Sequence, residues 1–206
     1  MDLTHEAFVH GSSIGNHAVA QAPSAVTHGN RFATVTRWMQ GVEAPPFWAG
    51  QLDHARGYVG PVDRWQIIRF EAPATIAIDV GVAPAGSGAV PVADDPGDRS
   101  HGVNGYVLNT VTPETDRSCH YFWAFCRNYN LNEQRLTHQL REGVAGIFHE
   151  DERVLEAQQQ SMDERPGRAF QNLNIDAGSM WARRLIDRMV AAEAPARAAL
   201  PLRSAA

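Results

Sequence analysis

The sequence predicts an α+β fold in which an antiparallel sheet packs on a long C-terminal helix. Segments up to about residue 129 alternate apolar and polar residues with the period of two that is typical of strands. Beyond residue 130 the period changes to 3.6, which indicates helices. Because the strands come first and the helices last, an α+β domain is favoured over an alternating α/β arrangement. A chain of 206 residues fits one such domain.

The predicted sheet begins with a hairpin between about residues 27 and 39, whose turn is His28-Gly29-Asn30. Four further strands are predicted at 64–70, 75–82, 105–111 and 120–129, and the last of these is the most aromatic part of the chain. Two segments are predicted to be loops. They are 41–48, which carries two prolines, and 83–103, which is rich in small and polar residues and is expected to be mobile.

Three helices complete the prediction. A short helix runs from Met1 to about His10 and is ended by Gly11, and a long helix covers residues 132–164. A last helix, from about Gly178 to Glu193, closes the fold. The predicted domain therefore spans residues 1–193, and residues 194–206 are expected to form a disordered tail.

Composition argues against nucleic-acid and membrane partners. The net charge is −5, and the basic residues are all Arg, scattered rather than clustered as phosphate binding requires. No run of 18 apolar residues exists and no signal peptide is visible, so a cytoplasmic location is expected. Cys119 and Cys126 are an odd number of residues apart in a strand, hence on opposite faces, which predicts buried free thiols in a reducing compartment.

One carboxylate lies where the long helix should be apolar. On a wheel of about 100° per residue, Asp151 falls in the centre of the apolar stripe, whereas Glu150 falls on the solvated side. The stripe residues within about 40° of Asp151 are Leu140, Val144, Ile147 and Leu155. A buried carboxylate needs a proton, an arginine or a metal ion. A buried salt bridge to one of the arginines therefore stays open as an alternative to a metal site.

Two histidines near the N-terminus offer further metal ligands. His5 and His10 are about 140° apart on a regular helix, so both can bind one ion only if the helix ends or bulges between them. Surface or core imidazoles are the alternative, and spacing alone favours it. The H-E-x-x-x-H spacing is one residue longer than the zinc protease motif requires, which weakens that interpretation.

Two histidines and a distant carboxylate form the ligand set of the facial-triad Fe(II) oxygenases. This hypothesis makes His5, His10 and Asp151 the metal ligands. Asp2 shares a helix face with His5 and suits a supporting role, accepting the second N–H of a ligating imidazole. The alternative for Asp2 is a solvated charge in the first helical turn. The aromatic residues 121–123, with Phe47 and Trp48, line a flat apolar pocket or are plain core.

The sequence resembles the oxygenase (α) subunits of vanillate O-demethylases, within the Rieske non-haem iron aromatic-ring oxygenases. The combination of HEAFVH with a later EDxxVLE segment is quite specific to the demethylase-like branch. The matching stretches run from the first residue to about Glu193 and are MDLTHEAFVHGSSIG, GVEAPPFW, PVDRWQIIRF, TPETDRSCHYFWAF, REGVAGIFHEDERVLEAQQQ and LNIDAGSMWARRLIDRMVAAE.

The resemblance implies a START-like helix-grip domain with Fe(II) held by His5, His10 and Asp151. It implies that Asp2 connects this iron to a Rieske histidine of a neighbouring subunit in a homotrimer. The family carries an N-terminal Rieske domain whose C-x-H and C-x-x-H pairs bind a [2Fe–2S] cluster. This sequence contains neither pair, so we expect a catalytic domain alone, from a truncated reading frame or a fragment, without an internal electron source.

The implied activity is an NAD(P)H-dependent monooxygenation that removes the methyl group of a methoxylated aromatic acid such as vanillate. Dioxygen and a flavin and iron–sulfur reductase are the implied co-substrate and partner. One alternative is a Rieske-family oxygenase acting on a methyl, sulfonate or halogenated aromatic compound. A second alternative is an inactive helix-grip domain that binds an apolar ligand, since a fold does not fix a function.

Overall fold

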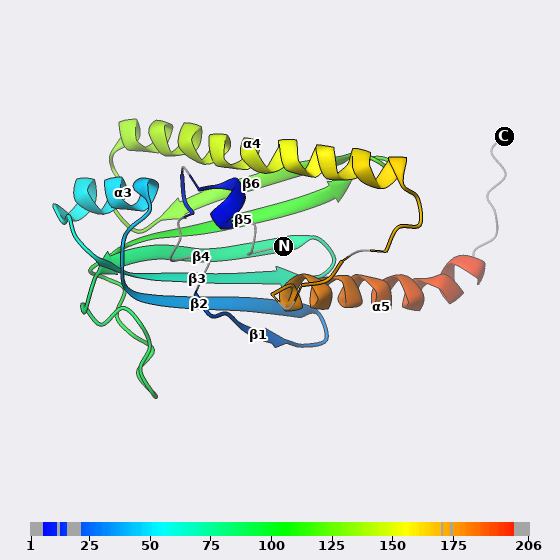
Figure 1. The fold of residues 1–206 in the computed structure, drawn as a ribbon, viewed down its shortest axis with the longest axis horizontal. Coiled ribbons are helices and arrows are strands. Elements are labelled where there is room, and N and C mark those ends of the chain that lie inside the picture. The colour runs from blue at the N-terminus through cyan, green and yellow to red at the C-terminus, as the bar shows by residue number, and fades with distance from the viewer. Residues whose placement is uncertain (1–5, 12, 16–21, 170, 174, 200–206) are drawn as a thin grey trace.

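The computed structural model describes residues 6–11, 13–15, 22–169, 171–173 and 175–199, and it contains a six-stranded antiparallel sheet (Figure 1). Each strand pairs with its neighbours in the chain, in the order β1-β2-β3-β4-β5-β6. The strands are β1 (Ala25–His28), β2 (Phe32–Val42), β3 (Val62–Glu71), β4 (Thr75–Pro84), β5 (Val103–Pro113) and β6 (Cys119–Arg127). The α+β, helix-grip prediction is confirmed.

Four helices accompany the sheet in the described part of the chain: α1 (Glu6–Val9), α3 (Pro46–Arg56), α4 (Gln134–Glu164) and α5 (Ala177–Ala199). The long helix α4 runs beside β5 and β6 (Figure 1). Helix α5 contacts β1 and β2, near the opposite edge of the sheet (Figure 1). The short helix α1 contacts α4. The N-terminal segment and the long helix, far apart in sequence, are therefore neighbours in space.

The face of the sheet that meets the helices carries the main core. One cross-strand row on this face consists of Val35, Ile68, Ile78, Val107 and Phe125. Trp48 and Leu52 from α3 and Leu136 and Leu140 from α4 are buried against this side of the sheet. Burial of one such side chain stabilises the fold by about 1.5–3 kcal/mol, so this core fixes α4 over the sheet.

On the opposite face, the described residues form a buried cluster at one end of the sheet. The 85–102 connection between β4 and β5 covers Trp65, which is fully buried with Ala83 and Ala89. Gly81 lies under the Trp65 ring, where an added Cβ would stand 2.4 Å from the ring and from the Val103 carbonyl oxygen. Only a residue without a side chain fits this position.

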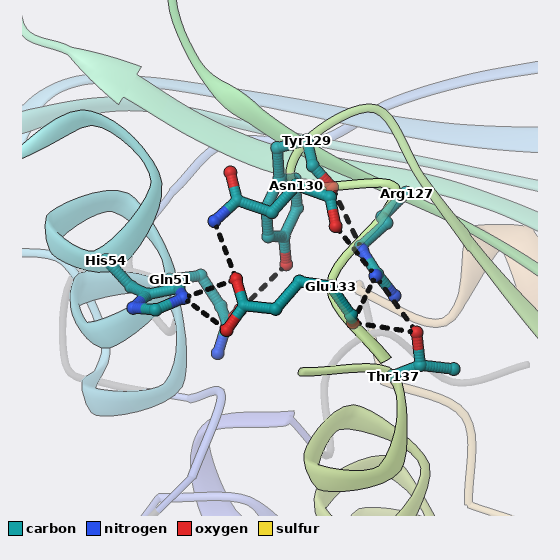
Figure 2. Close-up of polar contacts among 7 residues, drawn as sticks. All are labelled: Gln51, His54, Arg127, Tyr129, Asn130, Glu133 and Thr137. Atoms are coloured by element: carbon teal, nitrogen blue, oxygen red, sulfur yellow. Dashed lines mark hydrogen bonds and ion pairs between the residues drawn. The ribbon is translucent and has the colours of Figure 1, made fainter. Parts of the chain in front are cut away.

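A polar network ties α3 to the turn that precedes α4 (Figure 2). Glu133 accepts a hydrogen bond from Asn130, and its carboxylate lies 2.9 Å from Nε2 of His54 on α3. The buried Tyr129 donates its hydroxyl to Gln51 of α3 at 2.9 Å. Arg127 closes the turn by donating to the carbonyl oxygens of Tyr129, Asn130 and Glu133 and to the Thr137 hydroxyl.

Most predicted elements are confirmed, and one helix was missed. The hairpin, the four later strands and the long helix all form close to their predicted bounds. The prediction of a loop at 41–48 was wrong beyond Pro45, because α3 begins at Pro46. Proline is well suited to a first helical turn, where its missing N–H has no partner to lose. Helix α5 also continues to Ala199, past its predicted end at Glu193.

The cysteine prediction was half right. Cys119 and Cys126 are both free, as expected, but both are exposed rather than buried, and so are most side chains of β6. No helix among the described residues combines the length and the apolar character needed to cross a membrane.

Candidate metal centre

His10 lies directly after α1, at a tight turn. Its backbone N–H donates to the Glu6 carbonyl at 3.1 Å, which completes the helical turn. Its own carbonyl accepts from the backbone N–H groups of Ser13 and Gly15 at 3.0 and 2.8 Å. The helix therefore ends at Val9, one residue before the predicted end at about His10, and the imidazole of His10 is buried.

The imidazole of His10 stands between two neighbouring carboxylates of α4. Its Nε2 atom lies 3.1 Å from Oδ1 of Asp151, and its Nδ1 atom lies 2.6 Å from Oε2 of Glu150. The Ser13 hydroxyl donates to the same Glu150 oxygen at 3.2 Å. Two of the three predicted metal ligands, 141 positions apart in sequence, are thus brought into contact.

The spacing of His10 and Asp151 suits a shared metal ion. Adjacent corners of an octahedron lie √2 bond lengths apart, which is about 3.0 Å for metal–nitrogen and metal–oxygen bonds of about 2.1 Å. The observed 3.1 Å between His10 Nε2 and Asp151 Oδ1 matches this separation. Nδ1 of His10 faces Glu150, an arrangement that fixes the ring and its tautomer in metal sites.

The two carboxylates also perturb ionisation nearby. Burial lowers the pKa of His10, but hydrogen bonds and charges from Asp151 and Glu150 outweigh this effect and raise the pKa above its ordinary value. The pKa of Tyr121 is raised by burial and by the negative charge of Asp151. Negative charge is therefore concentrated at this point of α4, and a bound cation would neutralise it.

Asp151 marks the end of the buried stripe of α4 rather than its centre. Leu140, Val144 and Ile147 are buried as predicted, but the side chain of Asp151 is 28% exposed. Leu155, one turn later, is 61% exposed, so its predicted burial was wrong. Beyond Ile147, no described residue of α4 is buried, and most side chains in the second half of the helix are exposed.

The prediction that Glu150 lies on the solvated side of α4 was also wrong. The helical wheel put this side chain on the solvated face, but it bends back to His10 and Ser13 and is only 24% exposed. A wheel gives the direction of a Cβ atom and not the reach of a flexible glutamate. No feature of the α4 sequence alone distinguishes Glu150 from the neighbouring Glu152.

The remaining predicted site residues, Asp2 and His5, lie outside the described residues. Within the described part of the chain, no group of three or more His, Cys, Asp or Glu side chains is arranged to hold a metal ion. His10 and Asp151 lie close enough to bind one ion, and the prediction that His5 is the third ligand stays a prediction.

A hollow of about 530 Å³ opens between β6 and α4. Its aromatic wall includes Tyr121 and Trp123, both of which contact the Phe148 ring with centroids 5.5 and 5.4 Å away. The predicted aromatic stripe therefore lines a pocket. Phe47 and Trp48 pack against each other in the main core and are absent from the hollow's lining residues.

Comparison with protein-family models decides where the chain belongs. A model described as the vanillate O-demethylase oxygenase C-terminal domain matches residues 1–192. The chain belongs to this family. The vanillate O-demethylase oxygenase subunit of Pseudomonas sp. (strain ATCC 19151) is 45% identical to it over 203 residues, which are 97% of this chain and 60% of that protein. The chain thus spans well under two thirds of this relative.

Solved structures similar to this family member have the same fold. Dicamba monooxygenase bound to 3,6-dichlorosalicylic acid superposes with a TM-score of 0.80 at 26% identity, covering 94% of this chain and 54% of that one. Dicamba monooxygenase with non-heme iron and dicamba superposes with a TM-score of 0.68 at 24% identity, covering 95% and 56%. The second of these dicamba monooxygenase structures contains non-heme iron, and at 24% identity it supports the fold of this chain.

Proposed function

We propose that this chain is the mononuclear-iron domain of a Rieske-type oxygenase that O-demethylates a methoxylated aromatic acid such as vanillate. The observation that carries the proposal is the contact between His10, which follows α1, and Asp151 of α4. Apolar core packing does not explain a buried imidazole between two carboxylates. In a ferrous site, one carboxylate binds the metal beside the histidine and the other orients the imidazole ring. The proposed ligands are His5, His10 and Asp151.

The described residues near His10 would have different roles around such an ion. His10 and Asp151 hold it, and Glu150 fixes the His10 ring through Nδ1. The hollow between β6 and α4 offers an aromatic-lined space for a flat ring, and one of its lining residues, Tyr121, is close enough to Asp151 to be affected by its charge. When bound, the iron supplies the activation of dioxygen by electrons delivered one at a time.

The whole protein requires parts beyond this domain. Electrons are proposed to pass from NAD(P)H through a flavin and iron–sulfur reductase to a [2Fe–2S] Rieske cluster, and from there towards the iron by way of Asp2. A division into separate reductase and oxygenase proteins is supported by the name of the similar relative, an oxygenase subunit, and a homotrimer would let the cluster of one subunit serve the iron of another. The expected products are a phenol, formaldehyde and water.

A binding experiment on the purified chain tests this function without an electron source. After anaerobic reconstitution, metal analysis should find about one Fe(II) per chain. Nitric oxide added to the ferrous chain should give an EPR signal that changes when vanillate is added. Absence of iron after reconstitution would refute the metal site. An iron signal indifferent to vanillate, but altered by a sulfonated or chlorinated aromatic acid, would refute the substrate assignment alone.

A further inference from the structure

A buried polar cluster on the helix-side face of the sheet holds the segment that carries His10. Arg64 of β3 is fully buried, and its Nη2 atom donates to Oε1 of Glu6 at 2.6 Å and to the Ile14 carbonyl at 2.9 Å. Gln66, two residues along the same strand, donates its amide to the other Glu6 oxygen. One guanidinium nitrogen thus binds both ends of the segment 6–14.

In the described part of the chain, all the hydrogen bonds of Arg64 go to this segment. Its Nε and Nη1 atoms are buried and have no hydrogen-bond partner among the described residues. Burial lowers the pKa of the guanidinium, the charge and hydrogen bond of Glu6 oppose that effect, and Arg37 adds to it. A buried cation with so few partners is costly for the fold. General stability therefore does not explain this arrangement, whereas the hydrogen bonds to Glu6 and Ile14 point to a role in holding this segment.

We infer that Arg64, supported by Gln66, is a positioning residue that holds the His10 segment at the distance from α4 that metal binding requires. The link is short: Glu6 is the first residue of α1, and the His10 backbone N–H donates to the Glu6 carbonyl at 3.1 Å. Fixing Glu6 and Ile14 on the sheet fixes the turn between them, and with it the ring that reaches Asp151. This inference rests on the proposed function.

The neighbouring residue in β3 supplies a matched control. Asp63 is as buried as Glu6 but points to the other face of the sheet, where it accepts from the backbone N–H groups of Gly41 and Gly86 at 3.0 and 2.9 Å. It holds the irregular end of β2 at Gly41 and the turn after β4 at Gly86, and neither glycine hydrogen-bonds to the described residues of the His10 segment. Loss of this carboxylate should lower stability without moving His10.

The experiment compares Co(II) and Fe(II) affinity with thermal stability in the full chain. Arg64→Met alone would leave Glu6 buried and unpaired and could prevent folding. We therefore use Arg64→Lys, which keeps the charge, and the double variant Glu6→Met/Arg64→Met, which removes both charges together. The double variant should bind metal about 10–100-fold more weakly than wild type, the loss that is typical when a residue supporting a metal ligand is replaced. The Arg64→Lys variant should lose less affinity than the double variant.

The outcomes separate this inference from the proposed function. Asp63→Asn should lower Tm while leaving the metal affinity within about twofold of wild type. Hydrogen exchange of the backbone N–H groups of His10 and Gly15 should accelerate in the double variant and not in Asp63→Asn. If wild type binds metal and the double variant loses no more affinity than Asp63→Asn, Arg64 is purely structural and the inference fails. If wild type itself binds no metal, the proposed function fails first.

Discussion

Glu150→Ala should weaken ferrous binding although Glu150 is not a proposed ligand. Its Oε2 atom lies 2.6 Å from Nδ1 of the buried His10, so the substitution removes a short hydrogen bond between an imidazole and a carboxylate. Hydrogen bonds to charged groups contribute about 1.5–3 kcal/mol. Because the side chain is 24% exposed, water replaces part of the interaction and the lower half of that range applies. We expect about a tenfold loss of affinity.

An anaerobic Fe(II) titration against a competing chelator measures this loss. Glu152→Ala is the matched control, because Glu152 lies on the same helix and its carboxylate contacts only the exposed His149 among the described residues. Glu152→Ala should bind iron as wild type does. Equal affinities of Glu150→Ala and Glu152→Ala would refute the view that Glu150 orients His10.

Three further predictions concern the ligand, the turn before α4 and two glycines. Asp151→Ala should abolish Fe(II) binding in the same titration, a far larger loss than that of Glu150→Ala, and retained affinity would remove Asp151 from the site. The hydrogen bonds from His54 and Asn130 lower the pKa of Glu133 below its ordinary 4.5. The stabilisation is therefore present above pH 4.5 and lost as the pH falls through the lowered pKa. Thermal melts across this pH range should show a Tm gap between wild type and Glu133→Gln at pH 6 that closes in acid, and a constant gap would contradict this. Gly81→Ala should lower the unfolding free energy by about 1–3 kcal/mol or more, because its Cβ would collide with Trp65 and Val103. Gly146→Ala, which meets open space in α4, should raise it by up to about 1 kcal/mol, and urea titration of both variants checks the pair.

Periodicity predicted the architecture because the sheet and α4 bury one face each. Alternation in residues 64–70 and 75–82 marked β3 and β4 within a few residues of their ends. The failure at α3 has a local cause. Two consecutive prolines suggest a loop, but a proline in the first helical turn loses no hydrogen bond, and Trp48 and Leu52 then supply the buried contacts that hold the helix.

The contact between His10 and Asp151 was predictable from the sequence, but the residues that support it were not. Asp151 was predicted as a carboxylate in the centre of an apolar stripe, and the end of the helix before Gly11 allowed His10 to turn towards it. The contributions of Glu150 and Arg64 were missed. Neither Glu150 in its helix nor Arg64 in its strand stands out in the apolar periodicity. Their roles depend on which distant segment the fold places against them.

The most direct test is a crystal structure of the Fe(II)-loaded chain with anomalous data collected at the iron absorption edge. The account predicts one anomalous peak about 2.1 Å from Nε2 of His10 and from a carboxylate oxygen of Asp151, with His5 as the third protein ligand. An iron peak elsewhere in the chain, or His10 and Asp151 still in direct contact with no metal between them, would contradict it.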